Sequence, residues 1–228
     1  MNASKDDLHL YEECLLLALK DESGTKDPYV NLPLSLGGAL LADLLMLGKV
    51  EVEKEKRQSF LKLVDPSETG DPILDECTLK LHNAKRRANL GTWVQRFGAL
   101  RNLKHRAAEQ LVARGILKAR EDTVLLIFKR KIYPELDGRV EKEIVGRLKK
   151  AIFTRASDLD PRTVVLVSLA DKTGLLRATF DKKKLKEQKK RIEQIGKGEL
   201  IGAATQEAIN AAMSAIVAAS IVPVIVTS

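Results

Sequence analysis

Aromatic side chains are scarce in this sequence and make up 4% of its 228 residues. Proteins that hold single-stranded nucleic acid by base stacking need several aromatic platforms. The scarcity therefore argues against that class of protein. Charged residues reach 31% and apolar residues 44%. This composition is typical of a globular, helix-rich protein with a substantial core and not of a disordered chain.

The sequence also lacks a long, strongly apolar run. A helix that spans a bilayer needs about 20 strongly apolar residues. The longest apolar stretch, Ala208–Val226, is mostly alanine and is interrupted by polar residues and by Pro223. We interpret it as a buried core helix. The N-terminus, MNASKDDLHL, has no basic region followed by an apolar one. We therefore expect no signal peptide, a cytoplasmic location and only peripheral membrane contact.

Cysteine is limited to Cys14 and Cys77, and histidine to His9, His82 and His105. Neither cysteine has a CxxC neighbour or a histidine at ligand spacing, which argues against zinc. Two reduced thiols are expected, with a secreted disulfide as the alternative. No histidine lies in an HExxH motif or near a nucleophile elbow. The sequence thus offers no catalytic residue, metal ligand or cofactor site and predicts a protein that is not an enzyme.

Two other patterns that resemble sites have structural explanations. Asp71, Asp75 and Glu76 fall at an expected helix start, where carboxylates cap the helix and favour its dipole. The segment GKGELIG at 196–202 has glycines one residue too far apart for a dinucleotide fingerprint, and no strand precedes it. We assign neither pattern to catalysis or to a cofactor.

The net charge of +8 is unevenly distributed. Residues 96–155 carry 16 Lys and Arg against 7 Asp and Glu, a net +9, and residues 181–197 carry 8 against 3, a net +5. Residues 1–95 have a net charge of −4. Two local basic patches are typical of a protein that meets an anionic surface. Charge alone does not distinguish a phospholipid membrane from nucleic acid.

Apolar residues recur at helical spacing along most of the chain, which predicts one α-rich domain over residues 1–228. Asp6–Asp7 are candidate caps of the first helix, and Gly37–Gly38 are expected to lead into the second. A charged β-hairpin is expected over residues 49–64, with strands around Val50 and from Phe60 to Val64. Further helices are predicted at 7–20, 73–89, 139–155, 160–176 and 181–195.

The stretch from residue 98 to residue 134 is the most informative part of the chain. Its first half predicts an amphipathic helix ended by Gly115, with Arg101 and Lys104 three residues apart on one face. Its second half predicts a β-hairpin whose turn is the polar segment Arg120–Glu121–Asp122 and whose strands are apolar. Two bases beside an apolar hairpin favour a surface that touches a charged membrane. The alternative is a solvated helix face and a core strand.

Seven segments occur in the order typical of one protein family. They are LHLYEECLLLALKDESG, GGALLADLLMLGKVEVE, TGDPILDE, TWVQ, LRNLKHRAAEQLVARGIL, a hairpin that ends in YP, and DPRTVVLVSLADKTGLL. The chain resembles the Golgi phosphoprotein 3 family, the GPP34 domain, from about residue 7 to about residue 222. The segments are those of a divergent member, and a prokaryotic source is one interpretation.

The resemblance implies a mainly α fold with amphipathic helices around a central apolar helical bundle. It also implies peripheral membrane binding through phosphatidylinositol 4-phosphate. In the eukaryotic members, an aromatic residue and several arginines hold the headgroup, and an apolar hairpin dips into the bilayer. Those members bind the cytosolic tails of membrane glycosyltransferases and act as adaptors.

Carried over to this chain, two of the family's arginines correspond to Arg101 and Lys104, and a lysine lacks the bidentate grip of an arginine. The arginine before the glycine pair corresponds to Leu36. Tyr29 is the aromatic residue that the shortened loop offers. The family's arginine-rich N-terminal tail is missing. The inserting tip of the hairpin corresponds to Val124, Leu125, Leu126, Ile127 and Phe128.

Three functions from different classes follow. The first is a membrane adaptor that binds anionic phospholipid headgroups. The second is a nucleic-acid-binding protein that uses the basic patches, and the lack of a clear helix-turn-helix and of aromatic platforms argues against it. The third is a structural homo-oligomer that associates through the hairpin, because an apolar strand edge favours pairing with another chain.

Overall fold

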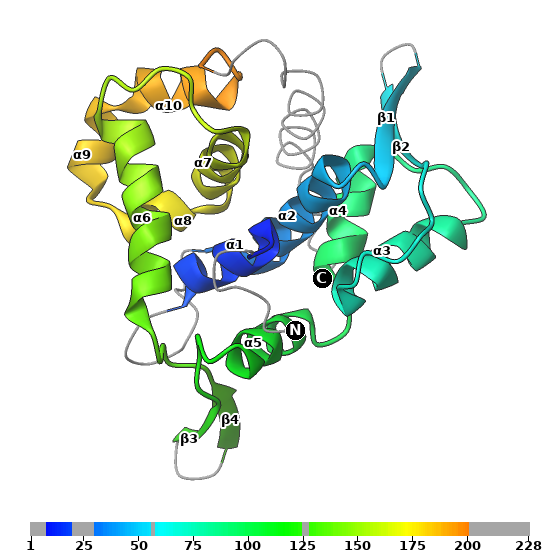
Figure 1. The fold of residues 1–228 in the computed structure, drawn as a ribbon, viewed down its shortest axis with the longest axis horizontal. Coiled ribbons are helices and arrows are strands. Elements are labelled where there is room, and N and C mark those ends of the chain that lie inside the picture. The colour runs from blue at the N-terminus through cyan, green and yellow to red at the C-terminus, as the bar shows by residue number, and fades with distance from the viewer. Residues whose placement is uncertain (1–7, 20–29, 56–57, 125–127, 201–228) are drawn as a thin grey trace, which may run out of the picture.

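The computed structural model describes residues 8–19, 30–55, 58–124 and 128–200. Within them the chain forms ten helices and two antiparallel hairpins (Figure 1), which confirms the mainly α fold with β-hairpins. The helices are α1 (Leu10–Ala18), α2 (Leu32–Met46), α3 (Pro72–His82), α4 (Leu90–Gly98), α5 (Leu103–Ala113), α6 (Gly138–Phe153), α7 (Pro161–Thr173), α8 (Leu175–Thr179), α9 (Lys182–Glu187) and α10 (Lys189–Gly196). The strands are β1 (Val50–Glu55), β2 (Gln58–Leu63), β3 (Arg120–Val124) and β4 (Phe128–Ile132).

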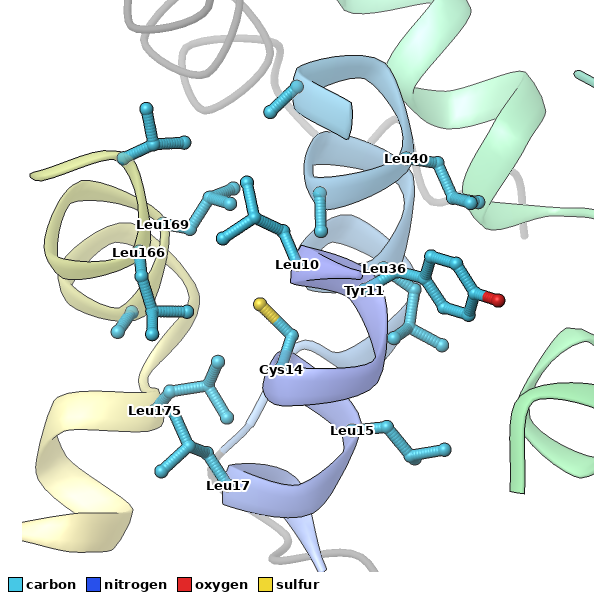
Figure 2. Packing of buried hydrophobic residues seen from close by; sticks show 14 of the residues in the cluster. Leu10, Tyr11, Cys14, Leu15, Leu17, Leu36, Leu40, Leu166, Leu169 and Leu175 are labelled. Atoms are coloured by element: carbon cyan, nitrogen blue, oxygen red, sulfur yellow. The ribbon is translucent and has the colours of Figure 1, made fainter. Parts of the chain in front are cut away.

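Helices α1 and α2 form the centre of the fold and pack against each other, with α4 on one side and α7 on the other (Figure 1). Every residue of α1 is buried, including Glu12 and Glu13. Figure 2 shows Cys14 and Leu17 pointing toward α7 and α8, while Tyr11 points the opposite way. Because apolar side chains leave α1 in both directions, one contiguous core runs through the described residues.

Charged groups from other helices stabilise the buried start of α1. The amides of Leu10 and Tyr11 donate to the carboxylate of Asp43 on α2 at 2.9 and 3.2 Å. Burial raises the pKa of Asp43 to about 7, against the opposing effect of these two hydrogen bonds. Glu13 pairs with two arginines, Arg147 of α6 at 2.7 Å and Arg162 of α7 at 3.1 Å. The expectation that Asp6–Asp7 cap this helix is wrong, since the helix begins three residues later.

The Tyr11 hydroxyl fixes α1 relative to α3 and α5. It lies 2.7 Å from Oδ2 of Asp71 and 2.6 Å from Oε1 of Gln110, and the Gln110 amide donates to the same Asp71 oxygen at 3.0 Å. The other Asp71 oxygen accepts from the first two free amides of α3. Burial and the nearby carboxylates of Glu12 and Asp71 raise the Tyr11 pKa far above its usual value. The capping role predicted for Asp71 is confirmed, and α5 is held in place from its last turns.

Two glycines allow α2 and α4 to cross in backbone contact. A Cβ at Gly37 would lie 2.1 Å from the carbonyl oxygen of Val94, and one at Gly98 would lie 2.2 Å from that of Pro33. The expectation that the Gly37–Gly38 pair opens a helix is wrong, because α2 already begins at Leu32 with Asn31 as its cap. Gly37 instead allows the close packing of α2 against α4.

The hairpin β3–β4 projects from the helices beside α5 (Figure 1). Its register pairs Glu121 with Lys131 and Val124 with Phe128. The polar segment Arg120–Glu121–Asp122 is therefore part of the first strand, and the expectation that it forms the turn is wrong. Residues of opposite charge are opposite each other in this register, Glu121 to Lys131 and Asp122 to Arg130, which favours it. The segment 125–127 connects the two strands and lies outside the described residues.

Several other boundaries differ from the expected ones. Helix α3 ends at His82, so the basic segment from Lys85 to Arg87 follows the helix and does not close it. The lysine-rich stretch forms two short helices that meet at Gln188. The hairpin β1–β2 is confirmed, and the helices predicted at 139–155 and 160–176 are found as α6 and as α7 with the first residues of α8. The predicted helix at 208–226 lies outside the described residues.

Candidate functional site

A small hollow lies where α2, α4 and the start of α5 meet, and we name it the α2–α5 hollow. Its volume is about 170 Å³. The close crossing of α2 and α4 creates it, because Pro33 and Gly98, which touch at that crossing, are both in its wall. The residues that line it are Leu32, Pro33, Leu36, Gly98, Leu100, Asn102, Leu103, Lys104 and His105.

Of the candidate phosphate-binding residues, Lys104 lines this hollow, whereas Arg101 is not among the lining residues and does not share a helix face with Lys104 as predicted. Helix α5 begins at Leu103, after Asn102 in the left-handed conformation (φ 54°). Arg101 therefore belongs to the turn before the helix, while Lys104 is in the first helical turn and lines the hollow. Arg101 is exposed and makes no ion pair or hydrogen bond with any residue that the structure describes. Its guanidinium is free to reach an anion at the rim.

The floor of the hollow is apolar. Leu36 lies in it and is 2% exposed. Leu36 is the position that corresponds to the family's arginine before the glycine pair. The structure thus shows that this position and Lys104 line the same hollow, which their spacing in the sequence could not establish. Arg106 does not replace that arginine, since its guanidinium pairs with Glu76 of α3. The cations at this hollow therefore come from the α5 side.

His105 connects the hollow to the hairpin. Its Nδ1 lies 3.0 Å from the hydroxyl of Tyr133, just after β4, and Lys131 of β4 pairs with Glu109 at 3.2 Å. Partial burial, then the positive charges of Lys104 and Lys131, lower the His105 pKa. The position of His105 directly after Lys104 in the first helical turn was the signal that could have placed it in the wall.

The remaining candidate site residues lie partly or wholly outside the described structure. Tyr29 and the hairpin residues Leu125, Leu126 and Ile127 are not among the described residues. For Val124 and Phe128 the structure gives the backbone pairing that closes the hairpin. The His105–Tyr133 contact and the Lys131–Glu109 ion pair hold the base of the hairpin against α5, and His105 also lines the α2–α5 hollow.

The buried polar groups serve the fold. Cys14 and Cys77 are free, buried thiols, and burial raises the pKa of Cys14 to about 12 and that of Cys77 further. Such thiols are poor nucleophiles because the thiolate is the reactive form. Asp75 accepts hydrogen bonds from the Thr69 amide and hydroxyl at 2.7 and 2.6 Å. Among the described residues, no cluster of three or more His, Cys, Asp or Glu could hold a metal ion.

Comparisons with known proteins identify the family of the chain. Among the described residues, no helix combines the length and apolarity that crossing a bilayer requires. A VPS74-like protein of Dictyostelium discoideum is 29% identical over 161 residues, which cover 64% of this chain and 61% of that protein. The family model described as Golgi phosphoprotein 3 (GPP34) matches residues 10–212. Since this match includes most of the sequence and all ten of the described helices, the chain belongs to the Golgi phosphoprotein 3 (GPP34) family.

Proposed function

We propose that this protein binds membranes peripherally through anionic phospholipid headgroups, with phosphatidylinositol 4-phosphate as the headgroup that the family resemblance implies. The observation that carries the proposal is the attachment of the hairpin to the wall of the α2–α5 hollow. The His105–Tyr133 contact of 3.0 Å joins the two. A cationic rim and an apolar hairpin held side by side can meet the headgroup and acyl regions of one bilayer together.

The headgroup would be held by Arg101 and Lys104. Arg101 can form two parallel hydrogen bonds to a phosphate, while Lys104 supplies a point charge. Each base near an anionic leaflet contributes about 1 kcal/mol. Because Leu36 supplies no charge from the α2 side, we expect the site to bind phosphate-bearing and other anionic lipids with modest discrimination.

The hairpin would add an apolar contribution. Residues 124–128 are all apolar in the sequence, and Val124 and Phe128 form the strand pair that is farthest from Tyr133. Full burial of a large apolar side chain is worth about 1.5–3 kcal/mol. Several such side chains and two bases together reach several kcal/mol, which is enough for reversible binding without a spanning helix.

An adaptor role would join this membrane contact to a protein partner. The family resemblance points to cytosolic tails of membrane proteins, and this remains a prediction for the chain. Homo-oligomerisation through the hairpin also remains a prediction. Nucleic-acid binding through the basic patches is the alternative, and a flat gel-shift titration at low salt would remove it.

Co-sedimentation with vesicles tests the proposal. Neutral vesicles, vesicles with phosphatidylserine, and vesicles with phosphatidylinositol 4-phosphate at matched charge would be compared at physiological salt. We expect binding to both anionic vesicles and a loss of about tenfold in Arg101→Ala/Lys104→Ala, from two charge-assisted contacts. A second variant with serines at 124–128 should bind more weakly to every anionic vesicle.

The matched control is Lys182→Ala/Lys190→Ala, which removes the same charge from two exposed positions on α9 and α10. It should bind vesicles nearly as the wild-type protein does. Equal losses in both double variants would show that only net charge matters and would refute the assignment to the α2–α5 hollow. Absence of vesicle binding in the wild-type protein would refute the membrane proposal.

A further inference from the structure

A second basic hollow lies between the end of α3 and α4, and we name it the α3–α4 hollow. Its volume is about 550 Å³, within the range of small-molecule sites. It is separate from the α2–α5 hollow, although both flank the same turn. Gly98 and Leu100 line the first hollow and Ala99 lines the second. The residues that line the second are Lys80, Ala84, Lys85, Arg86, Trp93, Arg96 and Ala99.

The charge in this hollow is strongly unbalanced. Four of its lining residues are cations and none is a carboxylate. Lys80 lies 3.8 Å from Glu76, which also pairs with Arg106. Lys85 and Arg86 are exposed and form no ion pair or hydrogen bond with any residue that the structure describes. Like charges held this close repel one another, so an anion would be bound favourably between them.

The neighbouring arginine shows that the imbalance is local. Arg87 turns to the hairpin β1–β2, where it pairs with Glu53 at 2.5 Å and with Glu55, and its guanidinium lies 4.6 Å above the Phe60 ring. Of the three consecutive basic residues Lys85, Arg86 and Arg87, only Arg87 is thus paired with carboxylates and stacked on an aromatic ring, among the described residues. The other two line the hollow without a carboxylate.

Trp93 forms an aromatic wall of the hollow and carries an unused donor. Its side chain is buried at 3% exposed, and its indole N–H has no hydrogen-bond partner among the described groups. The Arg96 guanidinium covers the ring at 4.7 Å. A buried donor without a partner is uncommon in proteins. The hollow thus combines an unpaired N–H donor, a stacked arginine and three further cations.

We infer that the α3–α4 hollow binds a phosphate monoester or diphosphate group. Arginine and lysine in one cluster match the charge and the oxygen geometry of phosphate. The group could belong to a lipid headgroup or to a soluble phosphorylated molecule, because the same contacts would serve both. This inference does not depend on the membrane proposal, whose site is the other hollow.

Trp93 makes the test specific, because it is the one tryptophan of the sequence. Its fluorescence would be followed while the full-length protein is titrated with pyrophosphate at constant ionic strength, with sodium chloride as the reference. We expect a saturable change that chloride does not produce. In Lys85→Ala/Arg86→Ala the apparent affinity should fall by about tenfold or more, because two charge-assisted contacts are lost.

Two double variants serve as controls. Arg101→Ala/Lys104→Ala and Lys182→Ala/Lys190→Ala should keep the pyrophosphate response of the wild-type protein. A response that is linear, that chloride reproduces, or that Lys85→Ala/Arg86→Ala leaves unchanged would overturn the inference. Circular dichroism would verify that each variant is folded, and the exposed Lys85 and Arg86 are not needed for packing.

A second experiment distinguishes a lipid headgroup from a soluble phosphorylated molecule as the ligand. Vesicles with phosphatidylinositol 4-phosphate would be added to the wild-type protein, and pyrophosphate would then compete for the Trp93 response. Competition supports the site with a lipid headgroup as its source, and a response to soluble pyrophosphate alone supports it with a soluble source. Loss of vesicle binding only in Arg101→Ala/Lys104→Ala, with the pyrophosphate response intact, would separate the two hollows.

Discussion

Replacement of Gly37 by alanine tests the backbone contact that shapes the α2–α5 hollow. The added Cβ would lie 2.1 Å from the Val94 carbonyl oxygen and 2.7 Å from the Gly98 amide nitrogen. Ordinary carbon–oxygen contacts begin at about 3.3 Å, so α4 would have to move away by about 1 Å. The obstructing atoms are backbone atoms, and no side-chain rotamer change can relieve the contact.

The magnitude follows from two opposing effects. An added methyl group in a well-packed interior costs about 1–3 kcal/mol, and a clash with backbone belongs at the upper end of this range. Alanine in a helix interior returns up to about 1 kcal/mol relative to glycine. We therefore expect Gly37→Ala to lower the free energy of unfolding by about 2 kcal/mol. For a chain of this length, that corresponds to a fall in Tm of roughly 4–8 °C.

Urea unfolding followed by circular dichroism and by Trp93 fluorescence would measure the change. Gly146→Ala is the matched control, because Gly146 is in the interior of α6 and a Cβ there would meet nothing within 4 Å. The control should gain about 1 kcal/mol from helix propensity. Equal effects of the two substitutions would refute the claim that the α2–α4 crossing depends on a missing Cβ.

Three further predictions follow from the hydrogen bonds and pKa shifts. Tyr11→Phe should lose about 1–2 kcal/mol in urea unfolding, because it removes a buried hydroxyl with two partners; an unchanged midpoint would contradict this. The hydrogen bond from Lys49 lowers the Asp65 pKa from 3.8 to about 2, so Asp65→Asn should be less stable than wild type above about pH 4, with the difference vanishing as the pH falls toward 2. A difference independent of pH would refute the role of that charge. A phosphate bound beside Lys104 should raise the lowered His105 pKa, so that vesicle binding strengthens as the pH falls; NMR titration of His105 with and without inositol phosphate would check it.

Much of the helical framework could be predicted because local signals agreed with tertiary packing. Asp160 and Pro161 mark the start of α7 as an acidic cap followed by proline at the first helical position. The apolar stripe of α6 recurs at helical spacing, and its members are buried. In α6 one face decides the structure and a single period describes that face, whereas every residue of α7 from Thr163 to Ala170 is buried and the local cap signal marks its start.

The errors occurred where the deciding contact is distant in sequence. The start of α1 is held by Asp43 from α2, so the nearby Asp6–Asp7 pair was a misleading cap signal. Gly37 is required by Val94, more than fifty residues away, and not by a helix boundary. The register of β3–β4 follows from cross-strand pairs of charged residues, such as Glu121 with Lys131, which no single-strand pattern reveals.

The candidate site illustrates the same limit in its chemistry. Sequence order placed Arg101 and Lys104 near each other, and the structure adds that Leu36 and Lys104 line one hollow. An anion in this hollow would be held from the α5 side and would meet an apolar wall on the α2 side. Contacts from one side select an anion by its charge more than by its shape, because hydrogen-bond donors must converge from several directions to orient it. Discrimination between anionic lipids in this family member would therefore depend more on the hairpin and on charge density than on recognition of one headgroup.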